Sequence, residues 1–247
     1  MNLTVLGCYG PYPTAGGACS GYLLEEDGYS ILIDCGNGTL SRLQAHISFK
    51  ALQAVLISHL HSDHMADLLI MRYGLELALA RGERLSPLFL CAPPDPAAEF
   101  ERLPYKNAYR LAPLEEGQRL EIGPFSITFQ KTVHILPCLA MRLETARGVL
   151  VYSGDTEIHP GLADFARGAD LFLCEANYQN EDMSANPPNH LSAAQAARIA
   201  VQAGVKRLLL THFHPERDPA VSLRQARDFF PAAEAAREGA IYQVGTG

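Results

Sequence analysis

One short stretch constrains this chain more than any other. Residues 55–69 read VLISHLHSDHMADLL, an apolar run followed directly by His59, His61, Asp63 and His64. The apolar run is typical of a buried strand, and in an extended segment His59 and His61 project to the same side because side chains alternate. A tight turn then brings Asp63 and His64 toward a neighbouring point. Imidazole and carboxylate are ligands of zinc and similar ions, so the stretch predicts a metal site at a strand end.

A solvated polar loop is the alternative interpretation of this stretch. A lone histidine favours that alternative, whereas so dense a cluster of potential ligands after a strand favours metal. Further potential ligands stand at the ends of other apolar runs: His134 after SITFQKTV, Asp155 in VLVYSGD and His212 in KRLLLTH. A polar residue at the exit of an apolar strand needs a reason, and most of the nine histidines lie in or near these segments.

The composition narrows the functional classes. The chain has 247 residues, 48% of them hydrophobic, and a net charge of −7, which argues against broad electrostatic binding to nucleic acid. No apolar run approaches the roughly 20 residues of a membrane span. The N-terminal segment does not resemble a signal peptide, and the six cysteines form no CxxC pair. We therefore expect a cytoplasmic protein with reduced thiols.

The order of elements predicts a single domain over residues 1–247. Strands are expected at 3–7, 20–26, 29–36, 52–58, 86–94, 139–145, 148–155, 169–176, 206–212 and 240–247, a hairpin at 120–132, and helices at 65–81, 190–204 and 218–230. Both halves mix strands and helices, with no long linker between them. The predicted fold class is α+β, a four-layer αβ/βα sandwich in which two mixed β-sheets pack face to face with helices outside.

The motifs together resemble the metallo-β-lactamase superfamily, and within it the ribonuclease Z-like branch. The resemblance rests on HLHSDH, on His134, on DCGNGT, SGDT and EANY, and on HLSAAQAARIA followed by LLLTH, and it spans nearly the whole chain. The HxHxDH motif is shared by lactonases, glyoxalase II and flavodiiron proteins, so it indicates the fold better than the substrate. SGDT together with the His-x-Ser helix is more specific.

The resemblance implies a centre of two divalent ions. It assigns His59, His61 and His134 to one ion, Asp63, His64 and His212 to the other, and Asp155 as the bridge. Zinc is the expected metal, with manganese or iron as alternatives. In such sites the ions lie about 3.5–4 Å apart and share a hydroxide that acts as the nucleophile. Because the ions outweigh the aspartates and the hydroxide in charge, the site favours an anionic substrate such as a phosphodiester.

The resemblance also supplies an acid for the leaving group. His190 follows the loop NEDMSANPPN and precedes a helix, and the family pairs a histidine there with a glutamate that matches Glu175. A carboxylate beside an imidazole raises its pKa and orients it. Candidate catalytic residues are therefore Asp63, His190 and Glu175. The alternative is that His190 and Glu175 are merely polar groups at the ends of a helix and a strand.

Other residues near the motifs leave two interpretations open. Asp67 either supports a histidine ligand or is an acidic residue in the first turn of a helix. His214 either shares the side of His212 or caps the HPERD loop. Asp34 is expected to orient the ligand loop by accepting an imidazole proton. The glycine-rich segment GPYPTAGGACSG either binds an anion through its amides or simply turns.

The substrate is where the sequence departs from the resemblance. Ribonuclease Z carries an arm that grips tRNA, inserted between the residues that match His134 and Asp155. Here only residues 135–154 separate the two, enough for a hairpin, and no basic insertion is present. Arm-less members of this branch include phosphodiesterases that act on small cyclic phosphates or nucleotides. The resemblance therefore implies a two-metal hydrolase of such a substrate or of an RNA-like phosphodiester, with tRNA less favoured and a homodimer as a further implication. The alternatives are a carboxylic ester, lactone or thioester hydrolase and a non-enzymatic metal sensor.

Overall fold

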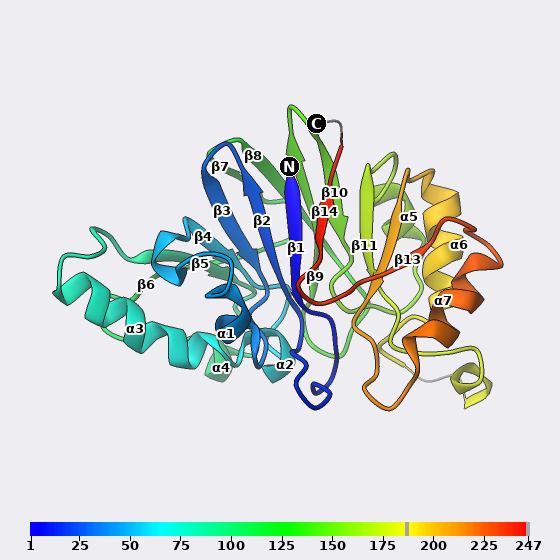
Figure 1. The fold of residues 1–247 in the computed structure, drawn as a ribbon, viewed down its shortest axis with the longest axis horizontal. Helices are drawn as coiled ribbons and strands as arrows, with labels where there is room; N and C mark the ends of the chain where they lie inside the picture. The colour runs from blue at the N-terminus through cyan, green and yellow to red at the C-terminus, as the bar shows by residue number, and fades with distance from the viewer. Residues whose placement is uncertain (186–187, 246–247) are drawn as a thin grey trace.

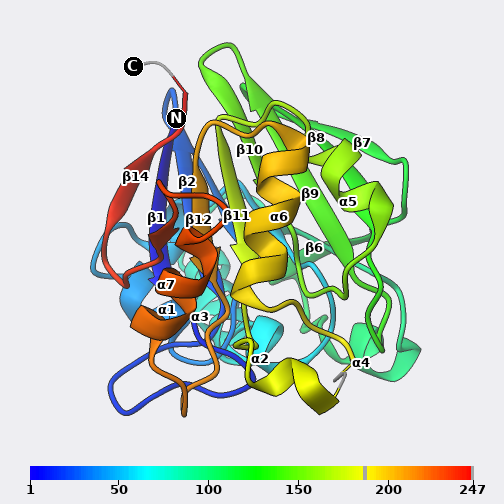
Figure 2. The same cartoon turned by 90° about the vertical axis from the view of Figure 1, so that its right-hand side faces the viewer.

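The structure, a computed structural model, describes residues 1–185 and 188–245. The strands form two seven-stranded mixed sheets. The sheets lie face to face with helices outside them, as Figure 1 and the perpendicular view in Figure 2 show. The α+β sandwich predicted from the sequence is confirmed. No helix in the described ranges is long and apolar enough to cross a bilayer.

The first sheet contains most of the N-terminal strands. Its order is β14-β1-β2-β3-β4-β5-β6. The strands are β1 (Asn2–Gly7), β2 (Gly21–Glu26), β3 (Tyr29–Ile33), β4 (Ala54–Leu56), β5 (Leu88–Ala92), β6 (Tyr109–Pro113) and β14 (Ile241–Gln243). β3 to β6 run parallel, so the loops after their carboxyl ends lie along one edge of the sheet.

The second sheet has the order β13-β12-β11-β10-β9-β8-β7. Its strands are β7 (Arg119–Ile122), β8 (Phe125–Lys131), β9 (Leu139–Thr145), β10 (Gly148–Tyr152), β11 (Leu171–Glu175), β12 (Leu208–Thr211) and β13 (Glu234–Ala235). β10 to β13 run parallel. The predicted hairpin between His134 and Asp155 is the antiparallel pair β9 and β10.

The helices cover the outer faces of the sheets. They are α1 (Thr39–Leu43), α2 (Ser62–Met65), α3 (Leu68–Ala80), α4 (Ala97–Arg102), α5 (Pro160–Phe165), α6 (Ala193–Ala203) and α7 (Pro219–Arg227), with 3-10 turns η1 (Phe49–Ala51) and η2 (Asp182–Ala185). α6 begins with a capping box of Ser192 and Gln195, a start that lies after the predicted one at 190. It ends at the left-handed Gly204, the stop that the sequence predicted. The sequence pattern did not indicate α1, α4, α5, β6 or β13.

Alternation along the strands sorts side chains between two cores. On β2 and β3, Leu24 and Ile31 face the second sheet, whereas Leu23 and Leu32 face the helices, where they join a cluster with Leu75 of α3. Both faces of this sheet are therefore apolar, which is why its strands appear in the sequence as continuous hydrophobic runs. All six cysteines are buried and free, as predicted.

The helix predicted over 65–81 is interrupted. α2 ends at Met65 and α3 begins at Leu68, and the loop after β3 accounts for the break. The Cys35 amide donates to the His64 carbonyl, and the Asp67 amide donates to the Cys35 carbonyl. These groups pair with a neighbouring loop instead of with the next helical turn, so the helix restarts after Asp67.

Candidate metal centre

The site lies where loops from both sheets meet. His59 and His61 follow β4, and α2 presents Asp63 and His64 directly afterwards. From the second sheet come the residues after β8, β10 and β12, which are His134, Asp155 and His212. The structure brings together all seven side chains proposed as ligands from the sequence; their coordination of metal stays a prediction.

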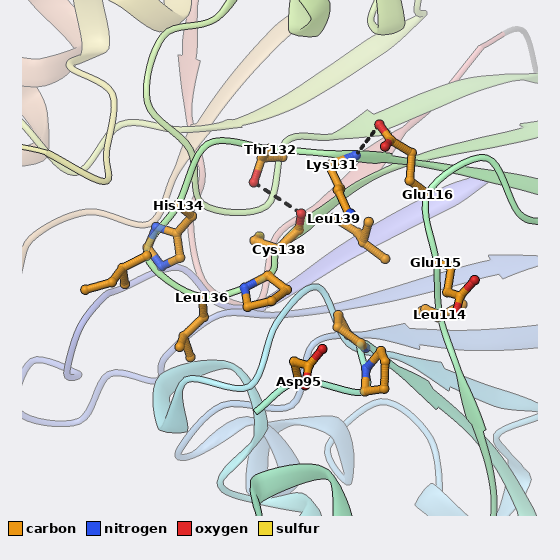
Figure 3. Close-up of a pocket in the computed structure, with 14 residues that line it drawn as sticks. Asp95, Leu114, Glu115, Glu116, Lys131, Thr132, His134, Leu136, Cys138 and Leu139 are labelled. Atoms are coloured by element: carbon orange, nitrogen blue, oxygen red, sulfur yellow. Dashed lines mark hydrogen bonds between the residues drawn. The ribbon is translucent and has the colours of Figure 1, made fainter. Parts of the chain in front are cut away.

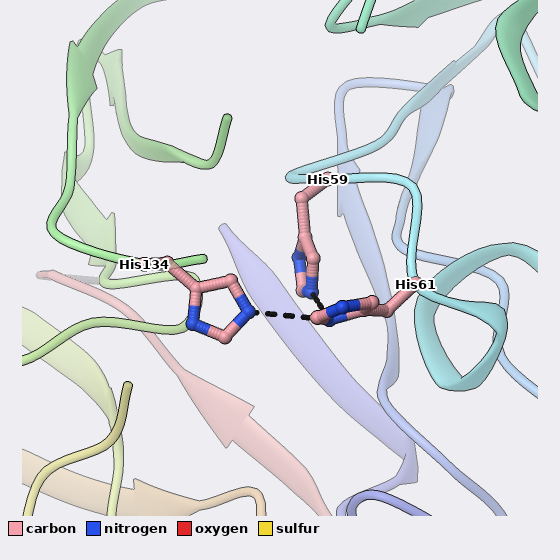
Figure 4. Close-up of side chains that lie close together, drawn as sticks. All are labelled: His59, His61 and His134. Carbon is pink, nitrogen blue, oxygen red and sulfur yellow. Dashed lines mark hydrogen bonds between the residues drawn. The ribbon is translucent and has the colours of Figure 1, made fainter. Parts of the chain in front are cut away.

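Three histidines form the first group (Figure 4). His59 Nε2 lies 2.9 Å from His61 Nδ1, and His134 Nε2 lies 3.1 Å from the same His61 nitrogen. Figure 4 shows the three rings converging with these nitrogens facing one another. Three imidazole nitrogens at one point are a typical donor set for zinc.

Asp63, His64 and His212 form the second group. His64 Nε2 and His212 Nε2 are 3.1 Å apart, and Asp63 Oδ2 lies 3.2 Å from His212 Nε2 and 3.5 Å from His64 Nε2. Burial acts to raise the pKa of Asp63, but His64 and His212 beside it lower that pKa well below its usual range. The carboxylate therefore stays ionised.

Asp155 stands between the two groups. Its Oδ2 lies 3.7 Å from His59 Nε2, 3.4 Å from His64 Nε2 and 3.3 Å from His212 Nε2. Both carboxylate oxygens are buried, and neither has a hydrogen-bond partner among the described residues. A buried carboxylate without hydrogen bonds is costly unless a positive charge lies beside it, as a bound cation would. Two divalent cations held by the two groups and shared by Asp155 fit this arrangement.

The protonation of two histidines of the first group, His59 and His134, fits the same purpose. Burial and the neighbouring His64 hold the pKa of His59 well below its usual value, and burial likewise lowers that of His134. Their rings are therefore neutral with a free lone pair. His134 Nδ1 lies 3.0 Å from the carbonyl oxygen of Asn189, an acceptor, so Nδ1 carries the proton and Nε2 faces the group.

Asp34 accepts an imidazole proton, as predicted. His64 Nδ1 lies 2.8 Å from Asp34 Oδ2, so the Nε2 of His64 is the nitrogen free to bind a metal. Asp34 is fully buried at the end of β3. The arrangement is the one in which a carboxylate orients a metal-binding histidine.

His190 and Glu175 lie next to the two groups. His190 Nδ1 is 3.1 Å from Glu175 Oε1 and 3.9 Å from Asp155 Oδ2, and its ring stacks on His212 with 5.2 Å between centroids. Burial alone lowers the pKa of His190, but the Glu175 carboxylate outweighs it and raises that pKa to about 9. Glu175 is itself held by the backbone amides of Thr156 at 2.6 Å and Leu191 at 3.2 Å. His190 does not begin a helix but lies two residues before the cap of α6.

Two cavities border the site. A small one of about 190 Å³ is lined by Pro11, His61, Ser62, Asp63, Asp155, His190 and His212. A larger groove of about 620 Å³ lies between the β8–β9 connection and the loops after β5 and β6 (Figure 3). His134 and Cys138 both line it, and each contacts a histidine of the first group. Among its lining residues, Asp95, Glu115 and Glu116 are acidic and Lys131 is basic.

The structure settles the open interpretations of the neighbouring residues. Asp67 lies at a helix start, as the N-cap of α3, but its carboxylate accepts the Leu40 amide at 2.8 Å, near the start of α1. No hydrogen bond among the described residues joins it to a ligand histidine. His214 Nδ1 accepts the Glu216 amide at 3.2 Å, which confirms the loop cap.

Three buried polar residues contact the site but were not predicted from the sequence. Ser58 lies 3.1 Å from His59 Nδ1, the Tyr152 hydroxyl donates to Asp34, and Asn177 Nδ2 donates to the carbonyls of Gly10 and His212 at 2.9 and 3.1 Å. Ser58 carried a usable signal, because it ends the apolar run before His59. Tyr152 and Asn177 carried none, since their partners are distant in sequence.

Comparison with known proteins finds a matching family model and similar chains. A model described as a beta-lactamase superfamily domain matches residues 29–213. The probable metallo-hydrolase YhfI of Bacillus subtilis is 36% identical, and the match covers 86% of each chain. The crystal structure of YhfI superimposes with a TM-score of 0.93 over 98% of both chains, at 32% identity.

More distant relatives include enzymes of phosphate chemistry. A ribonuclease Z of Lachnoclostridium phytofermentans is 24% identical over 96% of each chain. The crystal structure of a diphosphatase from the PhnP family has a TM-score of 0.78 at 18% identity and covers 100% of this chain and 99% of its own. At that identity the likeness shows the fold alone.

Proposed function

The chain belongs to the beta-lactamase superfamily and is a metallo-hydrolase of that fold, and from this premise we propose that it cleaves small phosphodiesters at a centre of two divalent cations, zinc first among them. His59, His61 and His134 are the proposed ligands of one cation, and Asp63, His64 and His212 those of the other. Asp155 is the proposed bridge. Cations bound there would lower the pKa of bound water and neutralise the charge of a phosphate group.

The observation that carries the proposal is the pair His190 and Glu175 beside Asp155. Cleavage of a phosphodiester requires a proton on the departing oxygen when that oxygen belongs to an alcohol. His190 lines the same small cavity as Asp63 and Asp155, and Glu175 keeps it protonated at neutral pH. We assign it the role of leaving-group acid, with Glu175 holding its Nδ1 so that the other ring nitrogen is the proton donor.

Asp63 has a second role in the proposal. Its carboxylate lines the small cavity and is held ionised by His64 and His212, so it can accept a hydrogen bond from an attacking water and orient that water. Asp63 thus orients the attacking water, and His190, held by Glu175, donates the proton to the leaving group.

The groove beside His134 supports a small substrate over a polynucleotide. Its apolar walls include Pro93, Leu114 and Leu136, and its volume suits one small molecule. Carboxylates outnumber the lysine among its lining residues, so a chain of phosphates laid along it meets repulsion. Together with the net charge of −7, this disfavours tRNA as the substrate.

The test compares two leaving groups. A His190→Ala variant is assayed with a p-nitrophenyl ester of thymidine 5′-phosphate and with a thymidine dinucleotide, whose leaving group is a sugar alcohol. Because nitrophenolate departs without a proton, we expect only a small loss with the first ester and a loss of about 10²–10⁴-fold with the second. The matched control is His46→Ala, an exposed histidine away from the site.

Two outcomes would contradict the proposal. Equal losses on both esters would remove His190 as the acid. Turnover of carboxylic esters, lactones or thioesters in place of any phosphodiester would establish the alternative reaction class. Metal analysis of the purified protein checks the cofactor separately, with two equivalents of a divalent ion expected.

A further inference from the structure

One buried carboxylate collects hydrogen bonds from both sheets. Asp34 Oδ1 accepts the Ser58 amide at 2.7 Å, and Asp34 Oδ2 accepts the Ser58 hydroxyl at 2.9 Å. The same Oδ2 lies 2.8 Å from His64 Nδ1 and 2.8 Å from the Tyr152 hydroxyl. Asp34, Ser58, His64 and Tyr152 are all fully buried. Because burial separates these bonds from bulk solvent, each donor affects the orientation of the carboxylate.

Through this carboxylate the two histidine groups share one support. Since the Ser58 hydroxyl donates its proton to Asp34, it accepts from His59 Nδ1, which lies 3.1 Å away. Asp34 therefore orients His64 of the second group directly and His59 of the first group through Ser58. Both rings consequently present Nε2 to the centre.

Tyr152 is the contribution of the opposite sheet. It is the last residue of β10, whereas Asp34 follows β3 of the first sheet. Its ring packs against Tyr22 with 5.2 Å between centroids, so the hydroxyl is held in place across the interface between the sheets. The Tyr152 hydroxyl is the one donor to Asp34, among the hydrogen bonds of the described residues, that does not come from the ligand-bearing segment 58–64.

We propose that Tyr152 is a positioning residue for the metal centre: its hydroxyl fixes the Asp34 carboxylate, and thereby the rings of His59 and His64, from the opposite sheet. The inference rests on the metal-binding part of the proposed function and is independent of the substrate. Outer partners of metal ligands typically change metal affinity by about 10–100-fold when they are removed.

The experiment measures metal affinity instead of turnover. Tyr152→Phe removes the hydroxyl and keeps the ring. Metal-free wild type and variant are titrated with Zn²⁺ against a chromophoric chelator, and we expect zinc binding weakened by about 10-fold or more. The absorption spectrum of the Co²⁺-loaded variant should also differ from that of the wild type, because the ring orientations around the ion change.

Tyr109→Phe is the matched control. Tyr109 is also buried, and its hydroxyl donates to the Leu68 carbonyl at 2.8 Å, outside the metal groups. Its zinc affinity should equal that of the wild type, although both variants lose one buried hydrogen bond. Thermal unfolding of the metal-free proteins shows whether the two losses of stability are comparable.

If Tyr152→Phe folds poorly, a second variant still tests the inference. Ser58→Ala removes the link to His59 and one donor to Asp34, so it too should weaken zinc binding, and the double variant should lose less than the two single losses combined. Wild-type affinity in Tyr152→Phe, or a loss equal to that of Tyr109→Phe, would overturn the proposal. Failure to hydrolyse phosphodiesters would leave these affinities interpretable, because they need no substrate.

Discussion

Two residues of the site have left-handed backbone conformations that residues other than glycine rarely adopt. Asp34 has φ of 55° and His212 has φ of 56°. Such conformations cost about 1–3 kcal/mol and persist where surrounding contacts hold them. The hydrogen bonds to the Asp34 carboxylate and the bond from Asn177 to the His212 carbonyl are contacts of that kind. The sandwich thus stabilises locally unfavourable geometry at the point where the ligands must converge.

The charge of His190 predicts the basic limb of the pH profile. Glu175 raises the pKa of His190 to about 9, so the protonated acid persists through neutral pH and is lost as the pH rises through that value. For a phosphodiester with an alcohol leaving group, kcat/KM should fall above about pH 9. In Glu175→Gln the carboxylate charge that raises the pKa of His190 is absent, so the fall in kcat/KM should begin at lower pH. An unchanged basic limb in this variant would contradict the assignment.

The Gly10 backbone lies so close to the His212 ring that a side chain at position 10 would collide with it. A Cβ at position 10 would lie 2.0 Å from His212 Nε2, so Gly10→Ala must displace the ring. We expect the variant to lose most of its activity and part of its bound metal, as measured by metal analysis. The control is Ala15→Ser, which also adds one heavy atom to the same loop at an exposed position. Full metal content in Gly10→Ala would show that the loop yields instead.

At the scale of elements, the start of α6 holds His190 and Glu175 in register. Leu191 donates its amide to Glu175, and the Tyr178 amide donates to the Leu191 carbonyl. Ser192 then caps the helix, and its side chain accepts the Gln195 amide while Gln195 reaches back to the Ser192 amide. The helix N-terminus therefore anchors the segment that carries the proposed acid.

Removal of this cap should destabilise the fold measurably. Ser192→Ala leaves helix amides without the side-chain acceptor, and we expect the free energy of unfolding to fall by about 1 kcal/mol. Urea denaturation of the metal-loaded protein measures it. Ser41→Ala, an exposed serine within α1, should cost nothing, because alanine favours the helix interior. Equal stability in the two variants would mean that the cap contributes little here.

At the scale of the whole molecule, the candidate centre joins the two sheets. The first sheet contributes His59, His61, Asp63 and His64 through one loop, and the second contributes His134, Asp155 and His212 through three. A cation bound by both sets links the halves of the sandwich. Metal binding and the stability of the fold should therefore be coupled.

Removal of metal should lower Tm. Asp155 is then left buried without a hydrogen bond from any described residue, and the stabilisation lost is about 2.7 kcal/mol where free metal exceeds its Kd 100-fold, a shift of about 5–10 °C for a chain of this size. Thermal scans with and without a chelator measure the shift. The same chelator should change little in Asp155→Ala. An equal shift in both proteins would indicate that the metal acts elsewhere.

The sequence alone determined the parts that depend on local pattern. Apolar runs predicted the strands, and potential ligands at their exits predicted the edge where the site lies, because parallel strands bring their carboxyl ends together. Only the tertiary structure decided the contacts between segments without a common pattern. The loop of Cys35 breaks the expected helix, Asp67 binds the Leu40 amide, and Tyr152 reaches Asp34 across the sheets. Periodicity tells which face a residue occupies, whereas its partner on the opposite face follows from how the two sheets pack.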